Sequence, residues 1–94
     1  MNGVIAAPNS TRIQARVVEI KAHEDGKFDC LLAVEKFEPL YGPCFLTLGE
    51  KISAFTYQSL QTISPGQALE LEVEYIGGPH KGTYQITNIT KLDE

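Results

Sequence analysis

The sequence predicts a single all-β domain that closes into a small barrel. Apolar and polar residues alternate with a period of two through most of residues 11–92, as they do in strands with one buried face. In the first of these runs the alternation slips by one residue at Val18, which indicates a β-bulge. A bulge bends a strand, so that one long strand can belong to two sheets of a closed barrel. The 94 residues suffice for one such domain with a modest core.

The first two strands are expected within residues 11–37. Ile13, Ala15 and Val17 share the face that we assign to the core, and beyond the slip Val18 and Ile20 take over that face. The Asp-Gly pair in "AHEDGK" then predicts a tight turn. In the second strand the expected inward residues are Phe28, Cys30, Leu32 and Val34, and the outward ones are Asp29, Leu31, Ala33, Glu35 and Phe37.

The middle of the chain allows two interpretations. Two prolines and a glycine in "EPLYGP" interrupt the alternation. From Ile52 to Ile63 apolar residues also recur at helical spacing, so the third strand is expected to end near Phe55, followed by a short helix or turn before "SPG". Within residues 44–57 the expected inward residues are Leu46, Leu48, Ile52 and Ala54, and the outward ones are Phe45, Lys51, Ser53, Phe55 and Tyr57.

The last two strands are predicted as a hairpin. "ALELEVEYI" is the most regular alternation in the chain, and "GGPHKG" supplies turn residues before the fifth strand, "TYQITNITKL". Tyr84 and Ile86 share one face of that strand. In the fourth strand Leu69, Leu71, Val73 and Tyr75 are expected inward, and Glu70, Glu72 and Glu74 outward.

This order of elements, with "SPGQALELEVEYIGG" and "KGTYQITNI" closing the chain, resembles the oligonucleotide/oligosaccharide-binding (OB) fold. The resemblance covers residues 11–92, and its most specific part is the Pro-Gly before the fourth strand with the glycine-rich hairpin after it. It implies a five-stranded Greek-key barrel with a short helix or turn between the third and fourth strands. An SH3-like barrel has a similar strand count and stays as the alternative fold.

The resemblance also implies a binding surface. OB folds bind ligands on the outer face around the second and third strands, between the loops that follow the first and fourth strands. Single-strand nucleic-acid binders need aromatic rings for bases and cations for phosphates. The residues expected on this surface are Phe37 and Phe55 as stacking rings, with Phe45 and Tyr57 near them, Arg12, Arg16, Lys27, Lys51 and Lys81 as phosphate contacts, and His80 at the rim. The glutamates of the fourth strand are expected to lie away from it.

A protein-interaction or assembly module with an OB fold is the alternative function. Outward aromatic residues often cover a partner chain, and arginine or lysine on a strand is often merely solvated. The net charge of −4 favours this alternative over a protein that grips nucleic acid by overall charge. Rising salt would abolish nucleic-acid binding but largely spare an apolar protein contact.

Catalysis, cofactors and metals are not expected, because no phosphate-binding loop, nucleophile motif or metal-ligand spacing occurs. Cys30 and Cys44 are expected as core thiols. A disulfide between them, and a zinc site that adds His23 and His80, are the alternatives, although no Cys or His pair has zinc-finger spacing.

Residues 1–10 are expected to form a poorly ordered tail and residues 11–94 the domain. The first residues have no basic region and only the short apolar stretch "VIAA", so a signal peptide is not expected. No apolar run reaches the roughly 20 residues that a membrane span needs. A cytoplasmic protein without a membrane partner is therefore expected.

Overall fold

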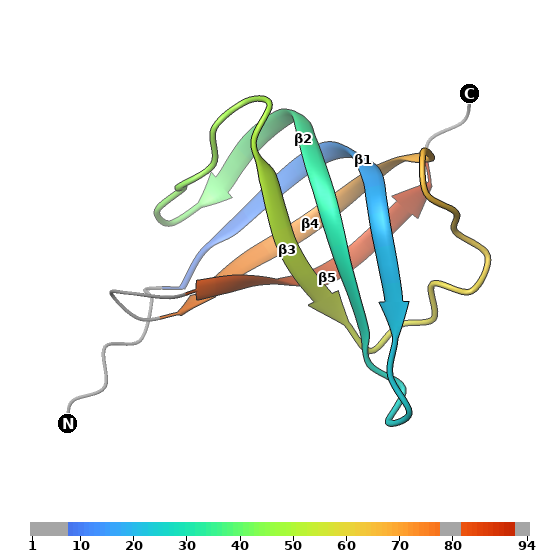
Figure 1. The fold of residues 1–94 in the computed structure, drawn as a ribbon. Coiled ribbons are helices and arrows are strands. Elements are labelled where there is room, and N and C mark those ends of the chain that lie inside the picture. The colour runs from blue at the N-terminus through green and yellow to red at the C-terminus, as the bar shows by residue number, and fades with distance from the viewer. Residues whose placement is uncertain (1–7, 78–81, 92–94) are drawn as a thin grey trace, which may run out of the picture.

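The computed structural model describes residues 8–77 and 82–91, which form five strands (Figure 1). They are β1 (Ser10–Ala22), β2 (Phe28–Tyr41), β3 (Lys51–Thr56), β4 (Ala68–Gly77) and β5 (Gly82–Lys91). The strands close into a barrel in the order β1-β2-β3-β5-β4, with β4 pairing back onto β1. Neighbouring strands are antiparallel except β3 and β5, which are parallel. The all-β class and the closed five-stranded barrel are confirmed, and the shape is consistent with an OB-like fold.

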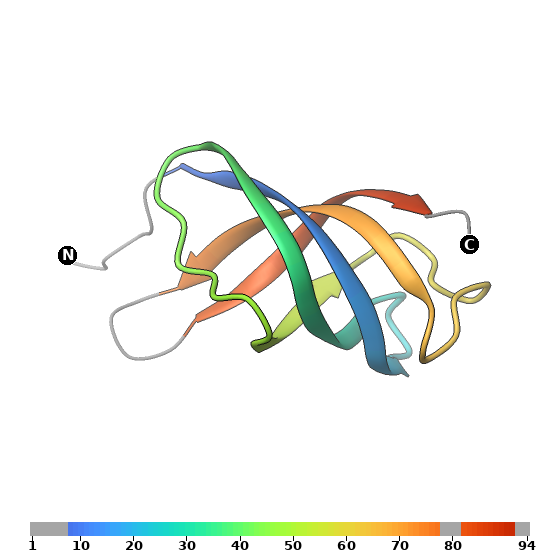
Figure 2. The same cartoon turned by 90° about the horizontal axis from the view of Figure 1, so that it is seen from above.

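Alternate residues of the strands fill the barrel, and the strands wrap around this core when seen from above (Figure 2). Successive strand residues point to opposite faces, so the expected period of two places every second side chain inside. Each fully buried side chain such as Ile13 or Leu71 contributes about 1.5–3 kcal/mol. The expected inward residues that are confirmed as buried are Ile13, Ala15, Val17, Phe28, Cys30, Leu32, Val34, Leu46, Ile52, Ala54, Leu69, Leu71 and Val73. Tyr84 and Ile86, which were expected to share a face, are both buried.

The expected bulge in β1 is confirmed, but one residue near it faces the wrong way. Val17 pairs with Leu32 and Glu19 pairs with Leu31, so Val18 is the extra residue. Val18 is exposed rather than inward. The extra residue of a bulge has no cross-strand partner, so its side chain does not follow the inward and outward alternation of the strand.

A second irregularity, in β2, was not anticipated. The β1–β2 register shifts between Gln14 and Ala15, where Glu35 is left without a partner. Beyond the shift Phe37 lies opposite the fully buried Ile13 and packs against the core. The outward orientation expected for Phe37 was therefore wrong, because this bulge reverses the faces of the strand after it.

The connection between β2 and β3 also differs from the expected structure. β2 continues through "EPLY", and β3 begins only after a loop at residues 42–50. Gly42 and Gly49 have positive φ values of 74° and 83°, which let the chain turn near both ends of this loop. Leu48 lies in the loop and is exposed rather than inward, because the alternation there continues outside any strand.

The connection between β3 and β4 is a series of turns, and no helix forms within residues 8–77 or 82–91. Leu60 is buried in the core and its carbonyl oxygen accepts a 3.1 Å hydrogen bond from Ile63 N–H. Of the two expected forms, helix or turn, the structure has the turn, since so short a segment gains little from helical hydrogen bonds. Accordingly, nothing in this described part is a helix capable of crossing a membrane.

The folded domain begins before the expected boundary at residue 11. Asn9 is buried, and its side chain pairs with Tyr75 as a strand backbone would. Tyr75 N–H donates to Asn9 Oδ1 at 2.8 Å, and Asn9 Nδ2 donates to the Tyr75 carbonyl oxygen at 3.2 Å. Residues 1–7 of the expected tail lie outside the described residues.

Candidate nucleic-acid interface

An open groove of about 650 Å³ crosses the outer side of the barrel from β1 to β5. Strand pairing builds its middle, because Leu31 of β2 lies between Glu19 of β1 and Ser53 of β3. Thr83 of β5 extends it by donating its hydroxyl to the Ser53 carbonyl oxygen at 3.2 Å. We call this surface the groove face; it is lined by Glu19, Ile20, Lys21, Asp29, Cys30, Leu31, Ser53, Ala54 and Thr83.

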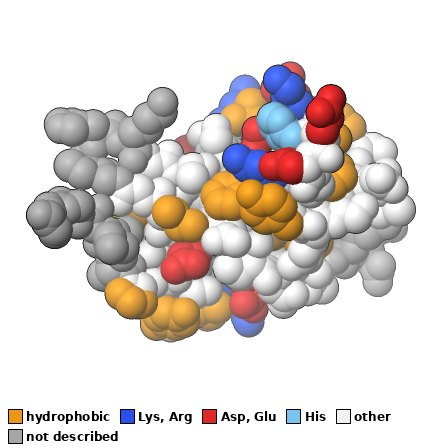
Figure 3. All heavy atoms as spheres, turned by 90° about the horizontal axis from the view of Figure 1, so that it is seen from below, with side chains coloured by type: hydrophobic (Ala, Val, Ile, Leu, Met, Phe, Trp, Pro, Cys, Tyr) orange, Lys and Arg blue, Asp and Glu red, His pale blue; other side chains and the backbone are white. Residues whose placement is uncertain are grey.

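Lys27, Phe55 and Tyr57 form a basic and aromatic cluster beside the groove. Phe55 is joined to the groove through Asp29, with which it pairs across β2 and β3. Lys27 Nζ lies 5.0 Å from the centre of the Phe55 ring, which is a cation–π contact. The Phe55 and Tyr57 rings meet edge to face, with centroids 6.3 Å apart, and Tyr57 is exposed. Figure 3 shows a face on which basic, acidic and histidine side chains gather beside hydrophobic ones.

Asp29 links this cluster to the β1–β2 hairpin. His23 Nε2 lies 2.7 Å from Asp29 Oδ2, and Lys27 Nζ lies 3.9 Å from Asp29 Oδ1. The hairpin itself is closed by Lys27 N–H, which donates to Asp25 Oδ1 at 3.1 Å. Asp29 therefore positions the lysine over the ring but also offsets part of its positive charge.

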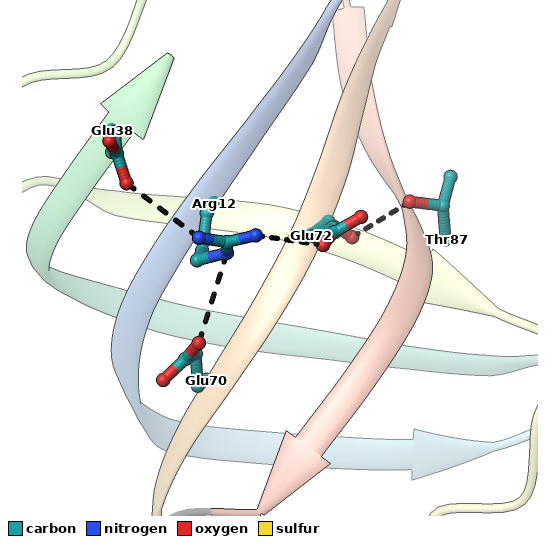
Figure 4. Close-up of polar contacts among 5 residues, drawn as sticks. All are labelled: Arg12, Glu38, Glu70, Glu72 and Thr87. Atoms are coloured by element: carbon teal, nitrogen blue, oxygen red, sulfur yellow. Dashed lines mark hydrogen bonds and ion pairs between the residues drawn. The ribbon is translucent and has the colours of Figure 1, made fainter. Parts of the chain in front are cut away.

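Arg12 lies on a different side of the barrel and is surrounded by carboxylates (Figure 4). Its guanidinium nitrogens lie 3.8 Å from Glu38 and Glu70 oxygens and 3.5 Å from a Glu72 oxygen. The expectation that the β4 glutamates lie apart from the basic residues was wrong, because β4 pairs with β1 and places Glu72 opposite Arg12. Three carboxylates around one cation leave a net negative surface, which repels phosphate.

Arg16 is likewise engaged away from the groove face. Its Nε lies 3.2 Å from Glu35 Oε2, and its Nη1 donates to the Gly66 carbonyl oxygen at 2.8 Å. These contacts join β1 to β2 and to the turn before β4. Both arginines expected to bind phosphate thus have partners within the protein.

The remaining residues expected at the interface fall into three groups according to their location. Lys51 is exposed on β3 with the same parity as Phe55, and within the described residues it forms no ion pair. Phe37 packs against the core and borders a separate hollow that Arg12 also lines. His80 and Lys81 lie outside the described residues.

The two cysteines are free thiols, as expected, and the alternative disulfide is not formed. Cys30 is buried, and burial, with a smaller effect of Asp29, raises its pKa from 9.0 to about 11. Cys44 is partly buried against the core. Across residues 8–77 and 82–91 no three side chains of the metal-binding kinds gather at one point.

No model of a known protein family matches the sequence, and no curated protein matches it significantly. The candidate interface therefore depends on the geometry of this chain alone.

Lys21, His23 and Asp29 were not among the residues expected at the interface. A signal for them was present in the Asp-Gly turn of "AHEDGK". Counting back from a two-residue turn at Asp25-Gly26 would pair Ala22 with Asp29, whereas the structure pairs Lys21 with Asp29 and Ala22 with Phe28. The turn signal therefore locates the hairpin, but its register differs by one residue. The pairing between β3 and the rest of the surface joins residues distant in sequence, and no local signal indicates it.

Proposed function

We propose that this chain is a non-catalytic OB-fold domain that binds single-stranded DNA or RNA weakly, with little sequence preference, across the groove face. One observation carries the proposal: Lys27 lies over the Phe55 ring, next to the exposed Tyr57 and beside the groove. An exposed ring can stack on any base, and a nearby ammonium group can contact the phosphate that follows it. Neither contact distinguishes one base from another.

The charges on this face support weak binding. Lys21, Lys27 and Lys51 are the basic residues that the described strands and hairpin place on this side of the barrel. Glu19 and Asp29 line the same groove and oppose a phosphate backbone. Since the two arginines are paired elsewhere, the number of phosphate contacts is smaller than the sequence alone suggested.

Replacement of Phe55 by alanine tests the stacking role. Loss of a stacked base should weaken oligo-dT binding by about 1–3 kcal/mol, measured by fluorescence anisotropy at low salt. Val18→Ala, an exposed apolar substitution on β1, is the matched control and should leave binding unchanged. A folded Phe55→Ala protein that binds as tightly as the parent would remove Phe55 from the site.

A second candidate function, protein docking, is favoured by a separate observation. Four of the exposed large hydrophobic residues lie between positions 40 and 48, at the end of β2 and in the loop after it: Leu40, Tyr41, Phe45 and Leu48. A photo-reactive phenylalanine analogue at position 45, used in the cells that produce the chain, should form a covalent adduct with a protein. The same analogue at position 57 serves as control, and the absence of any adduct specific to position 45 would contradict docking.

A further inference from the structure

One end of the barrel exposes a group of large apolar side chains that the groove face does not include. We call it the loop surface; it consists of Leu40, Tyr41, Phe45, Leu48 and Ile76. Two contacts show that the loop, the end of β4 and the segment before β1 meet: the Phe45 ring packs on the Tyr75 ring, and Asn9 bonds to the Tyr75 backbone. Figures 1 and 2 both show the β2–β3 loop at the same end of the molecule as the adjoining ends of β4 and β5.

The loop surface rests on three aromatic rings in tilted and edge-to-face contact. Phe45 and Tyr75 have centroids 5.1 Å apart, and Tyr75 and Tyr84 have centroids 5.2 Å apart. Gly82 leaves room for the Tyr75 ring, which would collide with a Cβ at that position. Phe45 is therefore held from below by the half-buried Tyr75 ring, which in turn packs on the buried Tyr84 ring, so ordering Phe45 in an interface costs little further conformational entropy.

The exposed area fits one half of a protein interface. Tyr41, Phe45 and Leu48 are 61%, 58% and 63% exposed, and Leu40 and Ile76 are each 39% exposed. With about 150–250 Å² for a large side chain, the five expose on the order of 500 Å². A standard interface buries about 800 Å² per partner, of which roughly 57% is apolar. The loop surface alone supplies that apolar share.

The loop surface also has both a projection and a hollow. A hollow of about 320 Å³ lies beside Phe45, and its lining is mixed: Phe45, Ile52, Tyr75, Gly82 and Tyr84, with the polar Glu50, Lys51 and Ser53 at its side. Leu48, the most exposed of the large apolar residues, is three positions from Phe45 in the same loop. In a two-fold dimer each copy places its projection in the hollow of the other copy. The same surface of both copies therefore forms the whole interface.

The charges near the loop surface favour a second copy over a strongly charged partner. Glu38, Glu50 and Glu74 adjoin it in sequence, and so do Lys36 and Lys51. A rim of mixed sign can pair with its own copy, whereas a rim of one sign would repel it. Addition of a strand along β2 is a poor alternative, because Pro39 lacks a backbone donor.

We infer that two copies of this chain associate through their loop surfaces, with Leu48 of each copy packed beside Phe45 of the other. The inference deepens the second candidate function and depends on it, and it does not require nucleic-acid binding. The two surfaces adjoin, because Ser53 lines both the groove and the hollow and Lys51 lines the hollow. Its partner is defined: an identical chain, held by apolar contact.

Sedimentation equilibrium of the full chain, from micromolar to millimolar concentration, tests this inference. The parent chain should pass from monomer to dimer, and high salt should leave the dimer in place because its contact is apolar. Leu48→Ser and Phe45→Ser should each weaken dimerisation about tenfold or more, as loss of a central interface residue does. Tyr57→Ser, an equally exposed aromatic site on the opposite part of the barrel, should not.

Two outcomes would overturn the inference: a monomer at every concentration, or a dimer that Tyr57→Ser weakens and Leu48→Ser does not. Circular dichroism of the variants separates a lost contact from a lost fold. The photo-adduct at position 45 then separates the two claims. An adduct of twice the chain's mass supports the dimer. An adduct of another mass contradicts the dimer but retains docking, and no adduct contradicts both.

Discussion

Single residues decide which charges of this protein are available to a ligand. Arg12 has three carboxylate neighbours within 3.8 Å and Arg16 has Glu35 at 3.2 Å, whereas Lys27 has, among the described residues, only Asp29, at 3.9 Å. Exposed ion pairs of this kind contribute little to stability, about 0–1 kcal/mol each. Their larger effect is on the surface potential, because a neutralised cation attracts no phosphate.

Substitution of Lys27 should therefore weaken nucleic-acid binding, whereas substitution of Arg12 should not change it. Lys27→Ala should weaken oligo-dT binding measurably at low salt, because it removes a phosphate contact and the cation above Phe55. Arg12→Ala should leave binding unchanged, since its charge is already offset by Glu38, Glu70 and Glu72. Anisotropy titrations of both variants decide the matter, and a larger loss for Arg12→Ala would place the ligand on the other side of the barrel.

Cys30 gives a prediction for pH dependence. Burial raises the pKa of its thiol to about 11, so the folded chain keeps a proton that the unfolded chain loses near pH 9. The thiol's contribution to stability is thus fully present below pH 9 and is lost as the pH rises toward 11. Urea unfolding at successive pH values should show this decline, and Cys30→Ala should make the decline smaller. An equal decline in the variant would assign it to other groups.

Among the elements, the loop between β2 and β3 has the strictest backbone requirement. A Cβ at Gly42 would overlap the Pro8 carbonyl oxygen and approach Asn9, and the residue also has a positive φ. Gly49 has a similar φ but nothing within 4 Å of a Cβ. Gly49→Ala should therefore cost about 1 kcal/mol of unfolding free energy from backbone strain alone.

Gly42→Ala should cost more than Gly49→Ala, by about 1–3 kcal/mol, because steric overlap adds to the same strain. Chemical denaturation of the two variants measures the difference directly. Equal losses of unfolding free energy would show that Pro8 and Asn9, which precede β1, can move away from the loop without destabilising the protein.

The elements also show what the sequence could and could not predict. Regular alternation in "ALELEVEYI" and "TRIQARV" placed their inward residues correctly, because period two follows directly from strand geometry. Leu48 and Phe37 were misplaced for different reasons. Leu48 continues the pattern in a loop that lies outside the strands, and Phe37 follows a bulge at Glu35 that no turn or glycine marks.

At the scale of the whole molecule, barrel closure determines the composition of each surface. Pairing of β4 with β1 brings the glutamates of β4 to Arg12, although 60 positions separate Arg12 and Glu72. Such long-range pairing cannot be obtained from local periodicity, and for this reason the expected basic patch of five cations was too large. Among the described residues, Lys21 lines the groove face, and Lys27 and Lys51 lie beside it with the Phe55 and Tyr57 rings.

This smaller set predicts a shallow dependence on salt. Two or three phosphate contacts to a single strand give a slope of about −1.4 to −2.1 in log affinity against log salt, whereas five would give about −3.5. Anisotropy titrations with oligo-dT over a series of salt concentrations measure the slope. A value near that for five contacts would mean that Arg12 and Arg16 leave their carboxylate partners on binding.

The most direct test of the central claim, that the groove face binds single-stranded nucleic acid, is an amide NMR titration with a short oligo-dT at low and high salt. We predict shifts at Lys21, Lys27, Phe55 and Tyr57 that fade as salt rises, with little change at Arg12. The claim is contradicted by the absence of shifts at low salt, and equally by shifts centred on Arg12 and the outer side of β4.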